Sequence, residues 1–289
     1  MITQTIPTMY FFGVTTGKSS SARMFPRWAK ILGLKRAQLV GVDLPINAPA
    51  SDYRAVVEQI KYDPLSLGAL VTTHRINVLR AAHDLFDELT SDAELCAEVS
   101  CIFKRAGRLV GHVADSYTSA RAMRQFIPAG HWSRANADIL SFGAGGAAVA
   151  ITTYFLTRAS TVDRPRRIVL VSRSQSKLAF IHQLVTSLPP SGIVFDYVEN
   201  ADPLRNDFLM SRLPPGSLVI NATGMGKDTP GSPITNAGWF PKNGIAWELN
   251  YRGELDFLRQ AQRQKELRQL HVEDGWNFFL IGWAEIIGT

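Results

Sequence analysis

A glycine-rich loop in the second half of the chain carries the clearest chemical signal. Gly143-Ala144-Gly145-Gly146-Ala147-Ala148 follows the apolar run 139–142 and precedes a stretch of helical character that reaches Leu156. This order predicts a strand, a tight turn and a helix whose positive end points at the loop. Gly143 permits the turn, Gly145 lets a pyrophosphate approach the backbone, and Ala148 allows close helix packing. The loop therefore predicts a dinucleotide site, with a glycine turn that serves packing alone as the alternative.

The next expected strand, 168–172, leads into residues that discriminate between the two nicotinamide dinucleotides. An NAD site places an acidic residue at this strand end, whereas this chain has Ser172, Arg173, Ser174 and Lys177. A guanidinium and an ammonium group here suit the 2′-phosphate of NADP. Arg173 lies 30 residues after Gly143, a longer interval than the ~20 that is usual. We expect NADP as the cofactor, with solvated charges at a helix start as the alternative.

Two α/β domains are expected to position these groups, because 289 residues exceed one ordinary domain. Short apolar runs alternate with helical patterns in both halves, which is typical of parallel sheets covered by helices. A polar, turn-rich stretch at 126–137 marks the expected junction, so the second half is predicted to form a Rossmann-like domain. The expected strands are 9–14, 38–42, 67–71, 139–142, 168–172, 193–198, 218–221 and 245–249, with a hairpin of 99–103 and 109–111.

Composition and charge limit the classes of function. Hydrophobic residues make up 46% of the chain and charged residues 19%, which excludes a disordered or fibrous protein. The apolar run 278–283 is far shorter than the ~20 residues of a membrane span, and 1–14 lacks the pattern of a secretory signal. We therefore expect a cytoplasmic protein without a membrane partner. The net charge of +6 is spread along the chain, which favours an anionic small molecule over nucleic acid.

Metal and disulfide chemistry are not expected. Cys96 and Cys101 stand among apolar residues, which predicts buried packing rather than a redox pair. The histidines lack the spacing of paired metal ligands, so no metal site is predicted. They are His74, His83, His112, His131, His182 and His271.

Several short motifs, taken in order, resemble those of the shikimate dehydrogenase family, and the resemblance extends from Phe12 to Ile287. The matching segments are Ser19–Met24, Ala69–Arg75, Gly111–Asp115, Gly143–Ala148, Ser172–Ser174 and Asn221–Gly226, followed by Glu248 with Tyr251 and by Asp274-Gly275. The resemblance implies a substrate-binding and catalytic domain of residues 1–125 that regains the C-terminal helices at 275–289. It implies a Rossmann NADP-binding domain at 126–274 and a place in aromatic amino acid biosynthesis.

The resemblance also implies a reaction and its catalytic residues. Family members pass a hydride from an alcohol carbon to NADP while a Lys–Asp pair carries the proton. Here Asp115 matches the aspartate, but Arg75 occupies the lysine position and stays protonated, so it cannot act as a base. Arg75 could polarise a keto oxygen or pair with a substrate carboxylate. The expected catalytic residues are Arg75, Asp115 and His74, with a helix cap as the alternative for Asp115 and a packing role for His74.

The implied substrate site also departs from the family. Ser19 and Ser21 match residues that hold the substrate carboxylate in the family, unless they only cap the first helix. Fewer groups are available to bind ring hydroxyls, which argues against shikimate itself. The positions where the family has polar residues hold Ala69, Val71, Ser100 and Gly282. We therefore expect a more apolar pocket and a cyclic acid related to shikimate.

Further residues complete the implied sites. The substrate contacts are expected to include Ser100, Tyr251 and, if the alignment slips by one or two residues, Thr72 or Thr73. The cofactor site is expected to gain three residues of the Asn221–Gly226 motif, which are Asn221, Ala222 and Thr223.

Three functions are compatible with these residues. The first is an NADP-dependent dehydrogenase of a cyclic hydroxy or keto acid, acting as a monomer or a homodimer. The second is a catalytically silent relative that binds NADP or a small acid and has a regulatory role, since Arg75 replaces the lysine. The third is a dehydrogenase of a pterin-type cofactor on the same two-domain plan.

Overall fold

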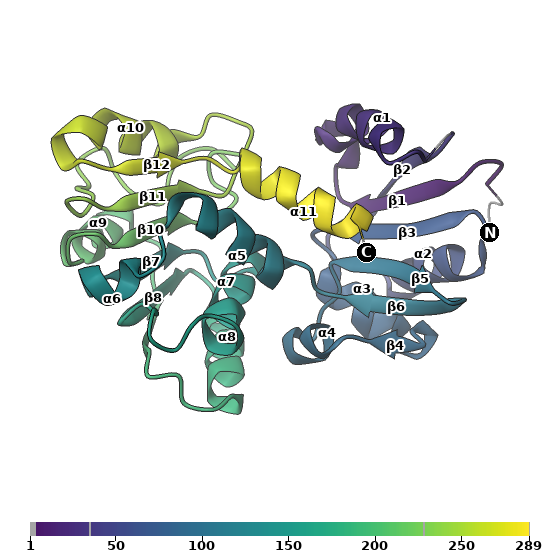
Figure 1. Ribbon diagram of the computed structural model, residues 1–289, viewed down its shortest axis with the longest axis horizontal. Helices are drawn as coiled ribbons and strands as arrows, with labels where there is room; N and C mark the ends of the chain where they lie inside the picture. The colour runs from purple at the N-terminus through teal and green to yellow at the C-terminus, as the bar shows by residue number, and fades with distance from the viewer. Residues whose placement is uncertain (1–3, 35, 228, 289) are drawn as a thin grey trace. The chain divides into compact units, whose positions relative to one another are not determined.

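The computed structural model describes residues 4–34, 36–227 and 229–288, and it confirms the α/β class (Figure 1). The chain forms two compact units. The first comprises the chain up to Ala114 together with the last residues from Ile286, and the second comprises Asp115–Glu285. Each unit contains one six-stranded sheet with helices packed against it.

The sheet of the first unit has the strand order β2-β1-β3-β5-β6-β4. Its strand β1 (Thr8–Gly13) is buried throughout and pairs in parallel with β2 (Gln38–Asp43) at the edge and with β3 (Ser66–Val71). The predicted hairpin is present as β5 (Cys101–Arg105) and β6 (Arg108–His112), which run antiparallel. A two-residue strand, β4 (Glu88–Leu89), closes the edge beside β6.

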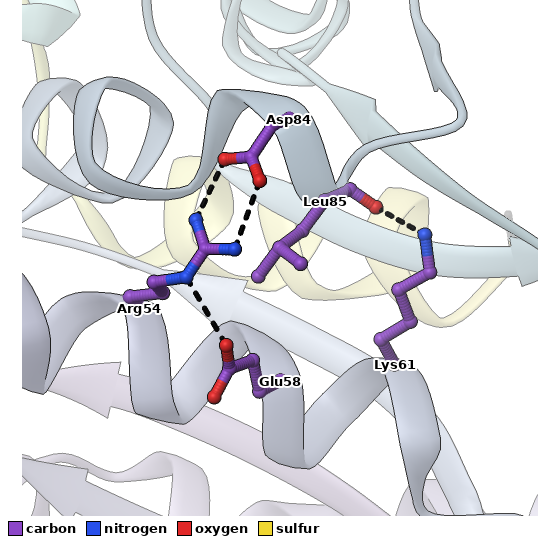
Figure 2. A network of polar contacts seen from close by, with 5 residues as sticks. All are labelled: Arg54, Glu58, Lys61, Asp84 and Leu85. Carbon is purple, nitrogen blue, oxygen red and sulfur yellow. Dashed lines mark hydrogen bonds and ion pairs between the residues drawn. The ribbon is translucent and has the colours of Figure 1, made fainter.

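Helices connect these strands. In chain order they are η1 (Thr16–Lys18), α1 (Ser21–Ile31), α2 (Ala50–Tyr62), α3 (Arg75–Ala82), η2 (His83–Leu85) and α4 (Ser91–Cys96). Helix α2 packs on α3, and polar contacts join α2 to the connection after α3 (Figure 2). There Arg54 donates two hydrogen bonds to Asp84, 2.6 and 2.8 Å, and Lys61 donates to the carbonyl of Leu85.

The sheet of the second unit has the order β12-β11-β10-β7-β8-β9, and all its recorded strand pairs are parallel. Its strands are β7 (Asp138–Phe142), β8 (Arg167–Ser172), β9 (Val194–Glu199), β10 (Leu218–Asn221), β11 (Ile245–Glu248) and β12 (His271–Glu273). The chain runs outward from β7 to β9, returns on the other side of β7 as β10, and continues to β12. The order therefore reverses between β7 and β10, where sheets of this kind bind ligands.

The core of the second unit lies on both faces of its sheet, because the strands carry apolar side chains on both faces. One face packs Leu140 and Phe142 against Met210, Phe257 and other buried side chains. The helices are α5 (Asp115–Phe126), α6 (His131–Ala135), α7 (Gly146–Thr157), α8 (Gln175–Ser187), α9 (Pro203–Ser211), α10 (Asp256–Arg268) and α11 (Trp276–Gly288).

The division into units differs in its boundaries from the expected domains. The sequence assigned 115–125 and 275–285 to the first domain, whereas the structure groups both segments with the second unit. Helix α5 packs on α7, and the rings of α11 lie against Trp247 and Tyr251 of the same unit. The substrate-binding role of the first unit and the cofactor-binding role of the second stay predictions.

Replacing Arg166 should destabilise the second unit. The guanidinium of Arg166 donates two hydrogen bonds, of 2.9 and 2.8 Å, to the carboxylate of Asp138, which is only 2% exposed. Arg166→Ala leaves this buried carboxylate without those bonds, so the free energy of unfolding should fall by about 1–3 kcal/mol. Urea denaturation measures the loss. Arg54→Ala is the matched control, since Arg54 and Asp84 are both exposed and such pairs contribute little. Equal losses in the two variants would contradict the expectation.

Candidate functional site

The glycine loop lies between β7 and α7, as its sequence predicts. Gly143 has φ +108°, and a Cβ atom on it would lie 2.5 Å from the carbonyl oxygen of Ala222. Gly145 is the N-cap of α7, and among the described residues no atom comes within 4 Å of the place where its Cβ would lie. Ala148 is 1% exposed. Glycine is therefore required at 143 by the neighbouring loop, while open space at Gly145 leaves the backbone accessible to a ligand.

The loops after β7 and β10 meet at the point where the strand order reverses. The backbone N–H of Ala222 donates to the carbonyl of Phe142 at 2.7 Å, and that of Gly143 donates to Val171 at 2.7 Å. These bonds bring the starts of the three loops after β7, β8 and β10 to one edge of the sheet. A dinucleotide bound across this edge would contact all three.

The loop after β8 carries the residues expected to select NADP. The hydroxyl of Ser172 accepts from the backbone N–H of Ser174 at 3.1 Å, and Ser174 caps α8 by accepting from the N–H of Lys177 at 3.4 Å. Arg173 and Lys177 are exposed, and no ion pair involves either of them in the part of the chain that the structure describes. Their charges are accessible to a ligand phosphate, and their selective role stays a prediction.

A buried network of amides and a carboxylate lies behind the loop after β10. Asn221 and Glu248, the last residues of β10 and β11, are each 0% exposed, and Asn250 is 5% exposed. Glu248 accepts from the side-chain amides of Asn221 and Asn250, both at 2.7 Å. Asn221 in turn accepts from the hydroxyl of Thr223 at 2.6 Å. Asn250 escaped the sequence prediction, although it follows a strand whose end was expected at the same edge as Asn221.

Burial raises the pKa of Glu248 to about 7, and the hydrogen bonds from Asn250 and Asn221 and the charge of Lys227 oppose this shift. Desolvation dominates because the carboxylate has lost its water while gaining neutral donors. The group therefore titrates near neutral pH within the candidate cofactor site.

His74 is enclosed in the first unit, where it is 2% exposed. Its Nε2 lies 3.2 Å from the carbonyl oxygen of Gly13 and 3.0 Å from that of Leu44, and its Nδ1 lies 3.3 Å from the hydroxyl of Tyr53. Two carbonyl neighbours require the proton on Nε2, so Nδ1 accepts from Tyr53. Both ring nitrogens are thus occupied, as in the packing alternative, and the catalytic role of His74 stays a prediction without support from its contacts.

Arg75 is the first residue of α3. Its Nε donates to the carbonyl of Val71 at 3.2 Å, and its Nη1 lies 3.6 Å from Oε1 of Glu98, which is 5% exposed. The sequence indicated Arg75 but not Glu98, because the two residues are 23 positions apart and no motif joins them. Asp115 is the first residue of α5 and belongs to the second unit.

The remaining predicted substrate residues occupy several places. Thr72 donates to the carbonyl of Phe12 at 3.1 Å, and Ser100, which is 1% exposed, accepts from the N–H of Ala114 at 3.0 Å. The hydroxyls of Ser19 and Ser21 lie 2.7 Å apart. Thr72, His74, Arg75 and Ser100 are therefore gathered at the ends of β1 and β3.

Tyr251 belongs to the second unit and stacks on Phe279 with ring centroids 4.3 Å apart. Helix α1 starts at Ser21 with Ser20 as its N-cap, and the Ser20 side chain makes no capping hydrogen bond. The Ser19 hydroxyl nevertheless accepts from the backbone N–H of Ser21, the first residue of α1, at 3.2 Å, so the helix-cap alternative keeps support for Ser19. The substrate-binding roles of Ser19, Ser21, Ser100, Thr72 and Tyr251 stay predictions.

Within residues 4–34, 36–227 and 229–288, no helix has both the length and the apolar character of a membrane span. The same residues contain no cluster of three or more His, Cys, Asp or Glu side chains suited to a metal ion.

The fold and the loop geometry define a two-unit α/β protein whose second unit has a Rossmann-like arrangement. No profile of a known protein family matches the chain. It is 27% identical over 236 residues to shikimate dehydrogenase (NADP(+)) of Streptococcus thermophilus, covering 81% of this chain and 76% of that protein. It is 24% identical over 263 residues to the enzyme of the same name from Methylocella silvestris, covering 91% and 83%. The resemblance is thus confirmed: the chain is similar, over most of its length, to proteins named shikimate dehydrogenase.

Solved structures share the fold at lower sequence identity. Shikimate 5-dehydrogenase from Listeria monocytogenes matches with a TM-score of 0.72 and 18% identity over 99% of this chain and 93% of that one. Quinate dehydrogenase from Corynebacterium glutamicum matches with a TM-score of 0.73 and 18% identity over 98% and 92%. Shikimate 5-dehydrogenase from Thermus thermophilus, solved with NADP(H) and shikimate, matches with a TM-score of 0.67 and 20% identity over 96% of this chain and 90% of that one.

The stability of the second unit should depend on pH through Glu248. Its pKa rises from 4.5 to about 7 on folding, so the unfolded state releases this proton first as the pH rises. Stability should therefore fall between about pH 4.5 and pH 7, by up to about 3 kcal/mol. Denaturant unfolding at several pH values measures this slope, and Glu248→Gln should remove it. An unchanged slope in Glu248→Gln would contradict the raised pKa, and Glu266→Gln on the exposed face of α10 serves as control.

Proposed function

We propose that this protein is an NADP-dependent oxidoreductase that interconverts a hydroxyl and a ketone on a cyclic acid related to shikimate but different from it. The observation that carries the proposal is the glycine loop between β7 and α7, with Gly143 against Ala222 and open space beside Gly145. The relatives named shikimate dehydrogenase (NADP(+)) support the same reaction class and cofactor.

The residues at the sheet edge fit the proposed cofactor. A side chain at Gly143 would collide with the backbone of Ala222, while the space beside Gly145 admits a pyrophosphate at the start of α7. Arg173 and Lys177 would hold the 2′-phosphate, beside Ser172 and Ser174. When bound, NADP supplies the acceptor for the hydride of the alcohol carbon. The chain's own residues orient it there: Gly143, Ala144, Gly145, Gly146 and Ala147 at the first loop, and Asn221, Ala222 and Thr223 at the loop after β10.

The residues of the first unit support a substrate other than shikimate. Ala69 and Val71 are fully buried side chains without polar atoms, and the hydroxyl of Ser100 already accepts from Ala114. A site with these residues offers few hydrogen bonds to ring hydroxyls, so it would discriminate against a polyhydroxylated ring. Ser19 and Ser21 keep their hydroxyls 2.7 Å apart and would hold a carboxylate.

The proton must be handled without the family's lysine. Arg75 keeps its charge at any ordinary pH and would stabilise an anionic oxygen or carboxylate, which leaves Asp115 to accept the proton. The guanidinium is oriented for this by the carbonyl of Val71 and the carboxylate of Glu98.

A catalytically silent, ligand-binding relative is the second candidate, and the contact of Arg75 with Glu98 favours it. A guanidinium that faces a buried carboxylate at 3.6 Å has less charge to offer a substrate. Absorbance of the reduced nicotinamide separates the two candidates, because any turnover with a panel of ring acids supports the enzyme. Binding of NADP without turnover across that panel would favour the silent relative.

Replacing Arg173 tests the choice of cofactor. Arg173→Ala removes a charge-assisted contact with the 2′-phosphate, which is worth roughly 1.5–3 kcal/mol, so NADP binding should weaken about 10- to 100-fold while NAD binding changes little. Titration calorimetry with both dinucleotides gives the two affinities. Arg212→Ala, an exposed arginine at the end of α9, is the control. Equal binding of NADP and NAD by the unaltered protein would argue against the cofactor assignment.

Arg75 tests the substrate and the proton path. Arg75→Ala should abolish most turnover of an active ring acid, because the anion loses its fixed positive partner. Arg75→Lys restores the family's Lys–Asp pair but not the missing hydroxyl contacts, so its activity on shikimate should be weak or absent at any pH. Reduction of NADP is followed by absorbance, with Arg80→Lys on the exposed face of the same helix as control. Robust NADP reduction with shikimate by the unaltered protein would overturn the substrate proposal.

A further inference from the structure

We propose that Glu248 is a positioning residue for the cofactor: through Asn221 and Asn250, its carboxylate fixes the loop Ala222–Met225, which borders the nicotinamide half of the dinucleotide site. This inference rests on the proposed function, because it assumes a dinucleotide at the edge formed by β7 and β10. According to this inference, Glu248, which lies outside the glycine loop, affects the binding of the nicotinamide half of the dinucleotide specifically.

The sheet itself places the carboxylate next to the first amide. Strands β10 and β11 run parallel, and their last residues, Asn221 and Glu248, are partners in the register. Both side chains are 0% exposed. A buried amide and a buried carboxylate at adjacent positions must satisfy each other, since water does not reach them.

Glu248 is surrounded by hydrogen-bond donors. Its Oε2 accepts from Nδ2 of Asn221 at 2.7 Å, and its Oε1 accepts from the backbone N–H of Asn250 at 2.8 Å and from its Nδ2 at 2.7 Å. A carboxylate accepts hydrogen bonds but donates none. It therefore forces both amides to turn their NH₂ groups inward, and this determines where their remaining polar atoms point.

The two oriented amides hold the loop. Oδ1 of Asn221 accepts from the backbone N–H of Thr223 at 3.1 Å and from its hydroxyl at 2.6 Å. Nδ2 of Asn250 also donates to the carbonyls of Thr223 at 3.2 Å and Met225 at 3.1 Å. The loop thus receives its backbone contacts from side chains whose orientation depends on Glu248.

The loop lies on the nicotinamide side by the topology of the sheet. In a doubly wound sheet, the half that begins with the glycine loop binds the first nucleotide, and the second half borders the other end of the dinucleotide. Here β7 and β8 belong to the first half and β10 and β11 to the second. The contact between Gly143 and Ala222 marks where the two halves meet.

The carboxylate form of Glu248 that this role requires is opposed by burial and favoured by its donors. Burial raises its pKa to about 7, while Lys227, on the loop side, and the amide donors favour the charged form. A buried carboxylate of this kind costs stability, and perturbed groups of this sort concentrate at functional sites.

Two ligands test the inference: NADPH, and 2′-phospho-ADP-ribose, which lacks the nicotinamide ring. Glu248→Gln retains the shape but replaces one acceptor by a donor, so the amides lose their fixed orientation. NADPH binding should weaken about tenfold, while 2′-phospho-ADP-ribose binding should stay within about twofold, since only the ring meets this loop. Both affinities come from titration calorimetry, which needs no turnover. Glu266→Gln, on the exposed face of α10, should change neither.

Thr223→Val provides a second variant that leaves the carboxylate intact. It removes the hydroxyl that donates to Asn221 and accepts from the N–H of Met225, so NADPH binding should again weaken more than binding of the fragment. Equal weakening of both ligands in either folded variant would mean that the network only supports the unit as a whole, and would overturn the inference. If the unaltered protein binds the fragment and NADPH equally well, the inference fails while the cofactor assignment stands. If it binds neither, the proposed function fails and the inference with it.

Discussion

The contact of Gly143 with the carbonyl of Ala222 is the constraint on which the candidate cofactor site depends. It occurs where the strand order of the second sheet reverses, so the loops after β7 and β10 must share one edge. A side chain at position 143 would separate these loops, and φ +108° is in any case a conformation that glycine adopts readily. The backbone N–H of Ala222 donates to the carbonyl of Phe142 at 2.7 Å, so the starts of the loops that carry Gly145 and the amide network lie at the same sheet edge. The turn at Gly143 and the strand order of the sheet thus both bring the loops after β7 and β10 to the same edge.

Two buried carboxylates orient neighbouring groups in the candidate sites in different ways. Glu248 in the second unit is met by neutral amide donors, so burial dominates and its pKa rises to about 7. Glu98 in the first unit lies 3.6 Å from the guanidinium of Arg75, a permanent positive charge. Neutral donors orient a carboxylate without fixing its protonation, whereas a guanidinium favours the ionised form. The first arrangement suits a residue that positions a loop, and the second a residue that orients a charged side chain.

The sequence predicts the features that local patterns encode. The α/β class, the hairpin of β5 and β6 and the loop of Gly143 follow from apolar runs, turn residues and one motif, each contained in a few consecutive residues. The partners Glu98 and Asn250 were not predicted, because they meet Arg75 and Asn221 only after distant strands have paired. The grouping of α5 and of α11 up to Glu285 with the second unit depends on contacts such as Trp247 with Phe278, which apolar periodicity does not specify. Long-range pairing, rather than local propensity, carries the missing information.

Arg75 in place of the family's lysine and the apolar residues Ala69 and Val71 can be explained together from the charges of the first unit. A lysine in place of Arg75 could lose its proton, and Glu98 beside it would then be a buried charge without a permanent cation. With arginine, the cation beside Glu98 keeps its charge at all ordinary pH values. The same unit has buried Ala69 and Val71 on β3, and neither side chain offers a polar atom. If these residues line the substrate site, as we propose, that site would distinguish ligands by shape and by one anionic group rather than by a set of hydroxyls, and for this reason the proposed substrate is a cyclic acid other than shikimate.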